Sequence, residues 1–317
     1  MKVFITREIP DIAVKLLKKE KFDVKIYRAD KPIPYQVLKK EVKNVDAVIS
    51  LLTDKFDKEI IDAMGRCKII ANYAVGYNNV DVNYAASKGI TVTNTPEVLT
   101  DSTADLAMTL VLACSRRLIE EEELMKKRKF KGCQPKLLLG IELKGKNFGI
   151  IGAGRIGTAV GKRAAAFGVQ ILYYDSLLNP ELDALGAKKV PLNLLLKKSD
   201  IISVHLPLTK STFHLLDKKR LSLMKENAVF INTATGEIVD EKELIKMLKA
   251  GRIFSAGFDV YENEPDINPE LFHLKNAMLL PHLGSATVDA RNAMAKLAAK
   301  NVISVLKGKR PITPVSP

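Results

Sequence analysis

Residues 147–175 read NFGIIGAGRIGTAVGKRAAAFGVQILYYD. The stretch opens with an apolar run, Phe148 to Ile151, which has the length of a buried parallel strand. A glycine-rich turn follows, then a segment of helical periodicity that continues to Phe167, and then a second β-type run from Val169 to Tyr174. The stretch closes on Asp175. It therefore predicts a strand–turn–helix–strand unit.

The glycines of this unit have the spacing G-x-G-x-x-G, which is typical of dinucleotide binding. Gly152 permits the tight turn, Gly154 lets the backbone approach a pyrophosphate, and Gly157 allows close helix–strand packing. The helix N-terminus offers unpaired N–H groups to the phosphates. Asp175 lies 18 residues after Gly157, near the spacing at which a carboxylate receives the ribose hydroxyls. Its charge would repel a 2′-phosphate, so the motif predicts NAD(H), with NAD preferred over NADP.

Length and composition favour a cytoplasmic globular protein. The 317 residues suffice for two domains, and no apolar run approaches the roughly 20 residues of a membrane span. The N-terminus lacks a signal-peptide pattern. The three cysteines include no C-x-x-C pair, which argues against a metal site and for a reducing compartment.

The net charge of +14 has two readings, nucleic-acid binding and a solvated lysine-rich surface. The lysines are mixed with glutamates, as in residues 120–131, and no nucleic-acid-binding motif accompanies them. We therefore expect no nucleic-acid partner and no membrane partner. A positive field would help to collect a small anionic substrate.

Residues 1–94 alternate short strands and helices, which predicts a parallel α/β layer. Strands are expected at 3–6, 23–27, 47–50, 68–73 and 90–93, and helices at 11–20, 35–42, 57–64 and 82–87. A long helix is expected from Thr100 through Arg117, with an extension to Arg128 left open. The arm of residues 129–146 is either a linker or a segment that wraps around a second subunit.

Residues 147–281 predict a second α/β layer of six strands, which matches a doubly wound nucleotide-binding sheet. The strands are expected at 148–151, 169–174, 201–204, 228–232, 255–259 and 277–280. Helices are expected at 155–167, 192–198, 218–224 and 241–250. The final helix, residues 286–306, follows after this sheet is complete, and we expect it to pack against the first domain.

Ligands of open α/β sheets bind beyond the carboxyl ends of the strands. Two of the four histidines, His205 and His282, follow predicted strands, whereas His214 and His273 lie in polar surroundings. A reaction at a carbonyl needs a proton donor that titrates near neutrality, and a carboxylate would orient that imidazole. His282 with Glu264 could form this pair, or His282 could be a structural histidine.

Seven stretches together resemble the D-2-hydroxyacid dehydrogenase family, and most closely its glyoxylate/hydroxypyruvate reductase branch. They are NYAVGYNNVDV (72–82), TNTPEVLTDSTADLA (93–107), the glycine motif (152–157), HLPLT (205–209), INTATGEIVDE (231–241), GFDVYENEP (257–265) and LLPHLGSAT (279–287). The resemblance implies NAD(H)-dependent reduction of a small 2-oxo acid to the D-2-hydroxy acid.

The resemblance also implies two doubly wound parallel-sheet domains with an active-site cleft between them. A flavodoxin-like substrate domain would comprise residues 1–98 and 286–317. A Rossmann NAD-binding domain would comprise residues 99–285, with the helix and arm through which a homodimer forms.

The family's site residues map onto this chain position by position. The catalytic positions are His282 as acid/base, Glu264 as its partner and Thr235 where the family has an arginine. The substrate positions are Leu52, Val75 and Gly76. The cofactor positions are Thr103, Gly152, Gly154, Arg155, Ile156, Gly157, Asp175, His205, Pro207, Thr233, Ala234, Asp259 and Gly284.

Two positions depart from the family pattern. Thr235 replaces the arginine that would bridge the carboxylate and the carbonyl of a 2-oxo acid, and a hydroxyl supplies neither that reach nor that charge. Cys133 stands where close relatives have a tryptophan, and the chain contains no tryptophan.

Three readings of these departures remain open. The chain is an enzyme impaired by Thr235, or an enzyme adapted to another substrate with a cation elsewhere. As a third reading, it is a nucleotide-sensing binding protein similar to the C-terminal-binding-protein corepressors.

Overall fold

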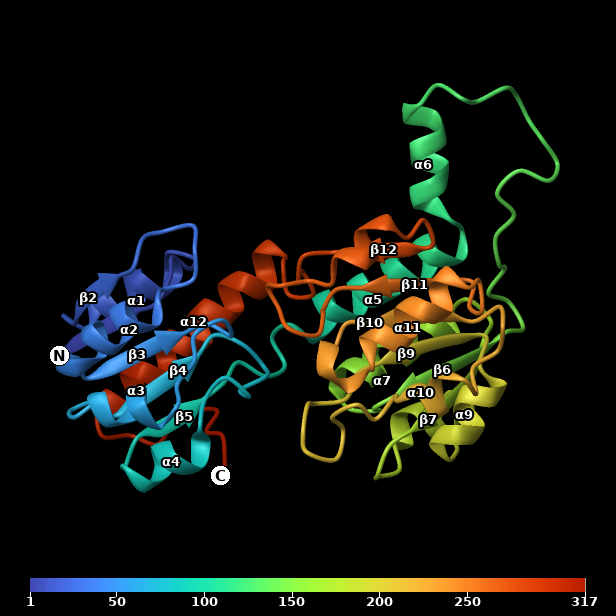
Figure 1. The fold of residues 1–317 in the computed structure, drawn as a ribbon. Coiled ribbons are helices and arrows are strands. Elements are labelled where there is room, and N and C mark those ends of the chain that lie inside the picture. The colour runs from blue at the N-terminus through green and yellow to red at the C-terminus, as the bar shows by residue number, and fades with distance from the viewer. Residues whose placement is uncertain (317) are drawn as a thin grey trace. The chain divides into compact units, whose positions relative to one another are not determined.

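The computed structural model describes residues 1–316, whose fold is shown in Figure 1. The chain divides into two compact units. One contains Met1–Leu99 together with the chain from Ser285 onward, and the other contains Thr100–Gly284. Each unit is built on one parallel β-sheet, so the prediction of two parallel-sheet α/β domains is confirmed.

The first unit contains a five-stranded sheet in the order β2-β1-β3-β4-β5. The strands are β1 (Lys2–Ile5), β2 (Asp23–Ile26), β3 (Ala47–Ser50), β4 (Ile69–Asn72) and β5 (Thr91–Thr93). The helices are α1 (Ile12–Lys19), α2 (Tyr35–Glu41), η1 (Val42–Asn44), α3 (Lys58–Ala63), α4 (Val82–Ser87) and α12 (Val288–Leu306). The two central strands β3 and β4 are buried along their whole length, as expected for strands covered on both faces.

The last helix, α12, packs against α1, β3 and β4 of the first unit. It begins at Val288 and not at Ala286 as predicted, because Thr287 is extended and caps it. The Thr287 hydroxyl accepts a hydrogen bond of 3.1 Å from the Ala290 N–H group. Much of the buried face of α12 consists of alanine, and these small side chains allow the helix to approach the sheet closely.

The second unit contains a seven-stranded sheet in the order β12-β11-β10-β9-β6-β7-β8. The strands are β6 (Asn147–Ile151), β7 (Gln170–Tyr174), β8 (Lys188–Lys189), β9 (Ile201–Val204), β10 (Val229–Asn232), β11 (Ser255–Phe258) and β12 (Ala277–Leu279). The helices are α5 (Thr100–Ser115), α6 (Leu118–Lys126), α7 (Arg155–Ala165), α8 (Pro180–Asp183), α9 (Leu192–Lys198), α10 (Lys218–Leu221), η2 (Gly236–Ile238), α11 (Glu241–Lys249) and η3 (Pro269–His273).

The prediction of six strands missed β8. This strand consists of two exposed lysines, which carry none of the apolar alternation that signals a strand. It pairs with β7 and ends the sheet with a short, charged edge that resists pairing with another chain.

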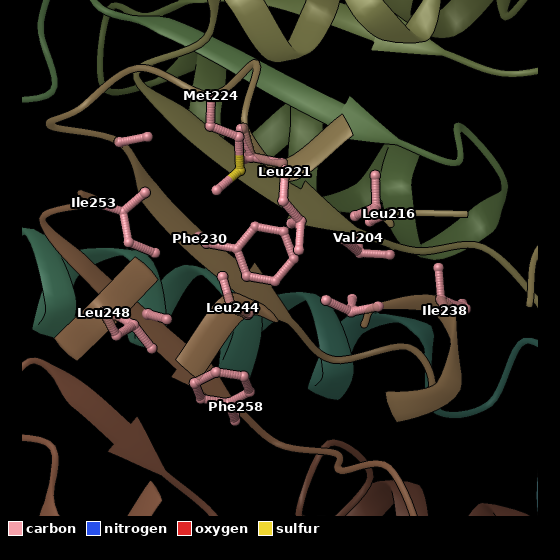
Figure 2. Packing of buried hydrophobic residues seen from close by; sticks show 14 of the residues in the cluster. Val204, Leu216, Leu221, Met224, Phe230, Ile238, Leu244, Leu248, Ile253 and Phe258 are labelled. Atoms are coloured by element: carbon pink, nitrogen blue, oxygen red, sulfur yellow. The ribbon is translucent and has the colours of Figure 1, made fainter. Parts of the chain in front are cut away.

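Two hydrophobic cores cover opposite faces of the seven-stranded sheet. Along β10, Phe230 belongs to one core, whereas Val229 and Ile231 belong to the other. Figure 2 shows Phe230 surrounded by apolar side chains that include Leu221 and Leu244. The opposite core contains residues of α5 and α7. Helices on both faces leave the ends of the strands as the accessible places for a ligand.

The helix from Thr100 ends at Ser115 and does not continue to Arg128. Arg117 adopts a left-handed conformation with φ of 57°, which separates α5 from α6. No residue of α6 is buried, and Figure 1 shows α6 and the segment after it extending away from the sheet. The chain returns at Ile141, whose N–H group donates to the Ser115 carbonyl over 2.8 Å. The segment from α6 to Ile141 therefore begins and ends beside Ser115 at the end of α5.

Candidate active site

The glycine turn lies where the order of the strands reverses. β6 has β7 on one side and β9 on the other, which is the arrangement at which open α/β sheets bind ligands. Gly152 has φ of 96°, and a Cβ there would lie 2.7 Å from the backbone of His205 after β9. A Cβ on Gly157 would lie 2.0 Å from the Gly152 carbonyl oxygen. Both glycines are therefore required by packing within the protein.

Gly154 differs from the other two glycines of the motif. It is the N-cap of α7, it makes no side-chain cap, and a Cβ added to it would meet no atom within 4 Å. The space beside it is therefore open at the N-terminus of a helix of 11 residues, where backbone N–H groups attract anions.

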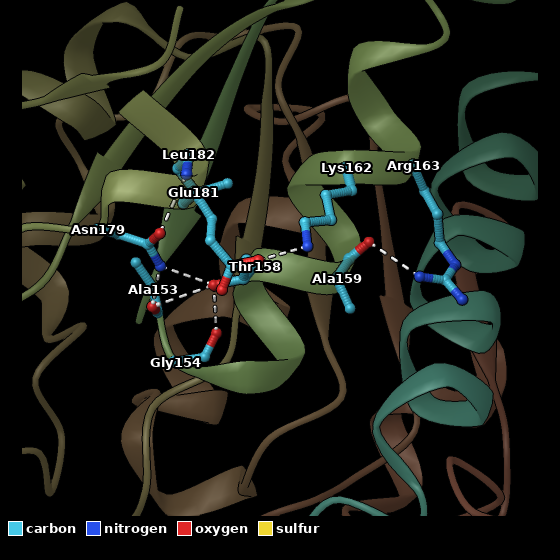
Figure 3. A network of polar contacts seen from close by, with 9 residues as sticks. All are labelled: Ala153, Gly154, Thr158, Ala159, Lys162, Arg163, Asn179, Glu181 and Leu182. Atoms are coloured by element: carbon cyan, nitrogen blue, oxygen red, sulfur yellow. Dashed lines mark hydrogen bonds and ion pairs between the residues drawn. The ribbon is translucent and has the colours of Figure 1, made fainter. Parts of the chain in front are cut away.

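A polar network fixes the turn in place (Figure 3). The Asn179 amide donates to the Ala153 carbonyl and to the Thr158 hydroxyl, each over 2.7 Å. The Thr158 hydroxyl donates in turn to the Gly154 carbonyl over 2.8 Å. Neither Asn179 nor Thr158 was among the predicted site residues. The signal for Asn179 was its place before Pro180, since asparagine at an N-cap and proline at N1 together start a helix.

A pair of variants separates packing from ligand binding at this turn. We expect Gly154→Ala to leave the melting temperature unchanged and to weaken NADH binding about tenfold or more, because the new methyl group would occupy the phosphate approach. Gly157→Ala should instead destabilise the protein by about 1–3 kcal/mol, because its methyl group overlaps the Gly152 carbonyl. Calorimetric unfolding and fluorescence titration with NADH measure the two effects. Normal NADH affinity in Gly154→Ala would contradict the assignment of this turn to the pyrophosphate.

The predicted cofactor residue Asp175 lies beside the glycine turn. One carboxylate oxygen accepts a hydrogen bond of 2.7 Å from the Ala153 N–H group. The other accepts longer bonds of 3.2 Å from Ser176 and Leu177. The structure thus joins the end of β7 to the end of β6, as binding of one dinucleotide by both would require.

Two buried polar atoms at predicted cofactor positions lack a hydrogen-bond partner in the described part of the chain. They are the Thr233 hydroxyl and Nδ1 of His205. The imidazole of His205 contacts the Ser203 hydroxyl through Nε2 over 2.8 Å, and burial lowers the pKa of His205 to about 3, so the ring is neutral at physiological pH. Buried polar groups are normally satisfied, and a bound ligand is one source of the missing partner. With the open space at Gly154, these atoms make the residues present compatible with a dinucleotide.

His282 and Glu264 form the pair that the sequence predicted as one of two readings. Nδ1 of His282 lies 2.7 Å from a Glu264 carboxylate oxygen. The other carboxylate oxygen accepts a bond of 3.0 Å from the Tyr261 N–H group, which fixes the carboxylate. The imidazole keeps 43% of its side-chain surface exposed. It is therefore an oriented and accessible histidine rather than a core residue.

Asp259 holds the loop that carries His282. Its two carboxylate oxygens accept bonds of 2.6 and 2.7 Å from the N–H groups of Leu283 and Gly284. Burial raises the pKa of Asp259, and these two bonds oppose that rise. A Cβ on Gly284 would lie 3.3 Å from the Thr103 side chain, so three predicted cofactor positions meet here. His282 itself has φ of 55°, an uncommon conformation that this loop maintains.

Thr235 belongs to a loop that packs against the Glu264 segment. The Asn232 side chain holds the loop with two hydrogen bonds of 3.0 Å. It donates to the Thr235 carbonyl and accepts from the Ala234 N–H group. Gly236 touches the backbone of Tyr261, where a Cβ would lie only 2.0 Å away. The second unit therefore places the loops of Thr235, Glu264 and His282 at neighbouring strand ends.

The three predicted substrate residues lie together in the first unit. Asn72 and Asn94 donate to the carbonyls of Gly76 and Val75, each over 2.8 Å. The Leu52 side chain lies 3.7 Å from the position of a Cβ on Gly76. Within residues 1–316, the N–H groups of Val75 and Gly76 donate to no protein acceptor. The carbonyls are thus fixed, and the two donors remain available for an anion.

No group of three or more histidine, cysteine, aspartate or glutamate side chains in residues 1–316 could hold a metal ion. No helix there is long and apolar enough to cross a bilayer.

Comparison with known proteins shows similarity along the whole chain. Residues 108–284 match the family model of the D-isomer specific 2-hydroxyacid dehydrogenase, NAD binding domain. A glyoxylate reductase from Thermococcus litoralis is 50% identical over 315 residues, covering 98% of this chain and 95% of that protein. A solved structure from Thermus thermophilus is 40% identical, with a TM-score of 0.94 and full coverage of both chains. An NADPH-dependent glyoxylate/hydroxypyruvate reductase from Sinorhizobium meliloti, solved with citrate, is 33% identical, with a TM-score of 0.87 and coverage of 99% and 97%.

Proposed function

The chain belongs to the D-isomer specific 2-hydroxyacid dehydrogenase family, and we propose that it reduces a small 2-oxo acid, such as glyoxylate or hydroxypyruvate, with NADH. The observation that carries this proposal is the His282–Glu264 pair, with 2.7 Å between Nδ1 and the carboxylate oxygen. The identity of 50% with a glyoxylate reductase over nearly the full length of both proteins supports the choice of substrate.

A nicotinamide dinucleotide, when bound at the glycine turn, supplies the hydride for the carbonyl carbon. The chain's own residues supply the proton for the carbonyl oxygen. Glu264 accepts the hydrogen bond from Nδ1 and stabilises the charged imidazole, so that Nε2 carries the proton that the carbonyl oxygen receives. The Tyr261 N–H group keeps Glu264 in that orientation.

The substrate carboxylate is assigned to the N–H groups of Val75 and Gly76. Two asparagines fix the carbonyls of this loop, and within residues 1–316 the two N–H groups have no protein acceptor. The net charge of +14 favours the approach of an anion. Thr235 supplies no charge to this anion, so we expect the activity of this chain to be lower than that of an enzyme with arginine at that position.

We further propose that the chain prefers NAD over NADP, although the Sinorhizobium meliloti relative is NADPH-dependent. Asp175 presents a carboxylate beside the glycine turn, where it can receive ribose hydroxyls and repel a 2′-phosphate. The neighbouring Lys189 donates to the Ser176 carbonyl over 2.9 Å, so this cation is already engaged with the backbone.

Replacing Asp175 with asparagine tests this preference. We expect the ratio of the Kd for NADPH to the Kd for NADH to fall about tenfold, because about 1.4 kcal/mol of charge repulsion is removed. Glu226→Gln removes one charge from an exposed side chain elsewhere in the same unit and should leave the ratio unchanged. Fluorescence titration with both nucleotides measures it, and a ratio unaffected by Asp175→Asn would refute the assignment.

A homodimer formed through α6 and the arm is also proposed. Five large apolar side chains of α6 and the arm are exposed: Leu118, Ile119, Met125, Phe130 and Leu139. Exposing apolar side chains to water is unfavourable, and a second subunit that covers them removes this cost. Cys133 lies exposed in the same arm.

The test of the function combines turnover with binding. NADH oxidation is followed with a panel of 2-oxo acids, and NADH binding is titrated directly on the same preparation. Turnover of glyoxylate or hydroxypyruvate is the expected result. Tight NADH binding without turnover of any acid would contradict it and favour the nucleotide-sensing protein, which the loss of charge at Thr235 makes the second candidate.

A further inference from the structure

One arginine at the carboxyl edge of the five-stranded sheet is not explained by the site described above. Arg7 follows β1 by two residues. Its Nη2 atom is buried and has no hydrogen-bond partner within residues 1–316. The guanidinium makes no ion pair there either. A buried cationic donor without an acceptor is unfavourable, and it becomes favourable when a ligand supplies the acceptor.

The nearest explanation within the fold is the buried Asp54, but it does not satisfy Arg7. The Asp54 carboxylate accepts hydrogen bonds from the Thr6 hydroxyl and from the Leu51 N–H group. Burial raises the pKa of Asp54, and the nearby charge of Arg7 opposes the rise without a hydrogen bond between the two. The Asp54 carboxylate therefore stabilises the positive charge of Arg7, but within residues 1–316 it accepts no hydrogen bond from the guanidinium. Arg7 as a whole is half-buried, so the side chain keeps contact with solvent.

Arg7 follows β1 and the Val75–Gly76 loop follows β4, so both lie at the carboxyl edge of the same parallel sheet. In the parallel register Ile5 pairs with Ile49, and Ile49 pairs with Ala71, so β1, β3 and β4 end at the same level. Two strand spacings separate β1 from β4, a distance of about 10 Å. An arginine side chain and a small 2-oxo acid together span this distance.

Hydrogen bonds also connect the loops between these strand ends. The Asn79 amide donates to the carbonyls of Leu51 and Asp54, each over 3.0 Å. It also lies 3.3 Å from the Asn72 side-chain oxygen, and the Asn72 amide holds the Gly76 carbonyl. The segment after β3, which contains Asp54, and the substrate loop after β4 are therefore parts of one network.

We propose that Arg7 is a substrate-binding residue whose guanidinium pairs with the carboxylate held by the Val75 and Gly76 N–H groups. A planar guanidinium matches a carboxylate with two parallel charge-assisted hydrogen bonds. The inference rests on the proposed reduction of a 2-oxo acid and names the cation of that same site.

The test compares Arg7→Gln and Arg7→Lys with Arg28→Gln, which removes an exposed arginine after β2 on the same sheet. For Arg7→Gln we expect kcat/KM for glyoxylate to fall on the order of tenfold or more, mainly through KM. The affinity of the NADH complex for oxalate, measured by calorimetry, should fall equally. NADH affinity and the melting temperature should stay unchanged, Arg7→Lys should keep part of the activity, and Arg28→Gln should behave as wild type.

Two results would overturn the inference. In one, Arg7→Gln equals Arg28→Gln in a wild-type background that does reduce glyoxylate, so that the function stands and the inference fails. In the other, Arg7→Gln and Arg7→Lys both lose NADH affinity and thermal stability together with activity, which marks a structural role. A wild-type protein that neither reduces a 2-oxo acid nor binds oxalate would reject the proposed function, and the inference with it.

Discussion

In His282→Asn, kcat for the reduction of glyoxylate by NADH is expected to fall about 10²–10⁴-fold. Asparagine is nearly isosteric with part of the ring but cannot deliver a proton near neutral pH. The loss should appear in kcat at saturating substrate, because the histidine acts on the carbonyl oxygen as charge develops there. Steady-state rates of NADH oxidation measure it.

The controls separate proton transfer from damage to the fold. NADH affinity should remain at the wild-type value, because Asp259 holds the loop of His282 through backbone N–H groups that the substitution leaves in place. His273→Asn removes an exposed histidine of η3 and should not change the rate. Glu264→Gln should cause a smaller loss of kcat, because the neutral amide no longer stabilises the charged imidazole. A His282→Asn variant with more than about a tenth of wild-type kcat would exclude the acid/base role.

Thr235→Arg is expected to raise kcat/KM for glyoxylate by about 10–100-fold. One added charge-assisted hydrogen bond contributes about 1.5–3 kcal/mol, and each 1.4 kcal/mol is a factor of ten. Thr235 is extended, with φ of −153° and ψ of 137°, so an arginine can adopt the same backbone without strain. The Asn232 side chain bonds only to main-chain atoms of this loop and should keep its shape.

Two matched variants separate geometry from general charge in this experiment. Thr235→Lys adds the charge without the planar fork and should gain less than arginine. Ser222→Arg adds the same charge at an exposed position after α10 and should have no effect beyond a small change in the salt dependence of the rate. If Thr235→Arg brings no gain, the threonine is not a deficiency, and the anion is held by other cations.

The sequence predicted most of the fold because its signals are local. An apolar run of four or five residues, a glycine turn and a helical period each act within a few neighbours, and 11 of the 12 strands of the described chain fall on predicted segments. The missing strand, β8, contains two lysines and exists only because β7 offers an edge for pairing. The helix expected through Arg117 ends at Ser115, and the extension to Arg128 that was left open does not occur, because Arg117 is left-handed, which no propensity indicated.

The candidate site could be predicted where the function requires a particular residue type at a particular position. The glycine spacing, Asp175 and the two histidines after strands were visible in the sequence alone. Asn179 and Thr158 were not singled out, because their role is to bond to the carbonyls of a turn formed by other residues. The sequence likewise gave no reason to single out Arg7, whose buried Nη2 atom has no hydrogen-bond partner in the described part of the chain.

For the opening stretch, residues 147–175, the sequence alone determined a strand, a glycine turn, a helix and a closing aspartate, because each depends on short-range sterics and periodicity. Only the tertiary structure decided what these elements meet. It brought the Asp175 carboxylate to the Ala153 N–H group, Gly152 against the backbone of His205, and Glu264 to the imidazole of His282. Such contacts join the ends of different strands, and they depend on strand order and register, which arise from packing of the whole sheet rather than from any single segment.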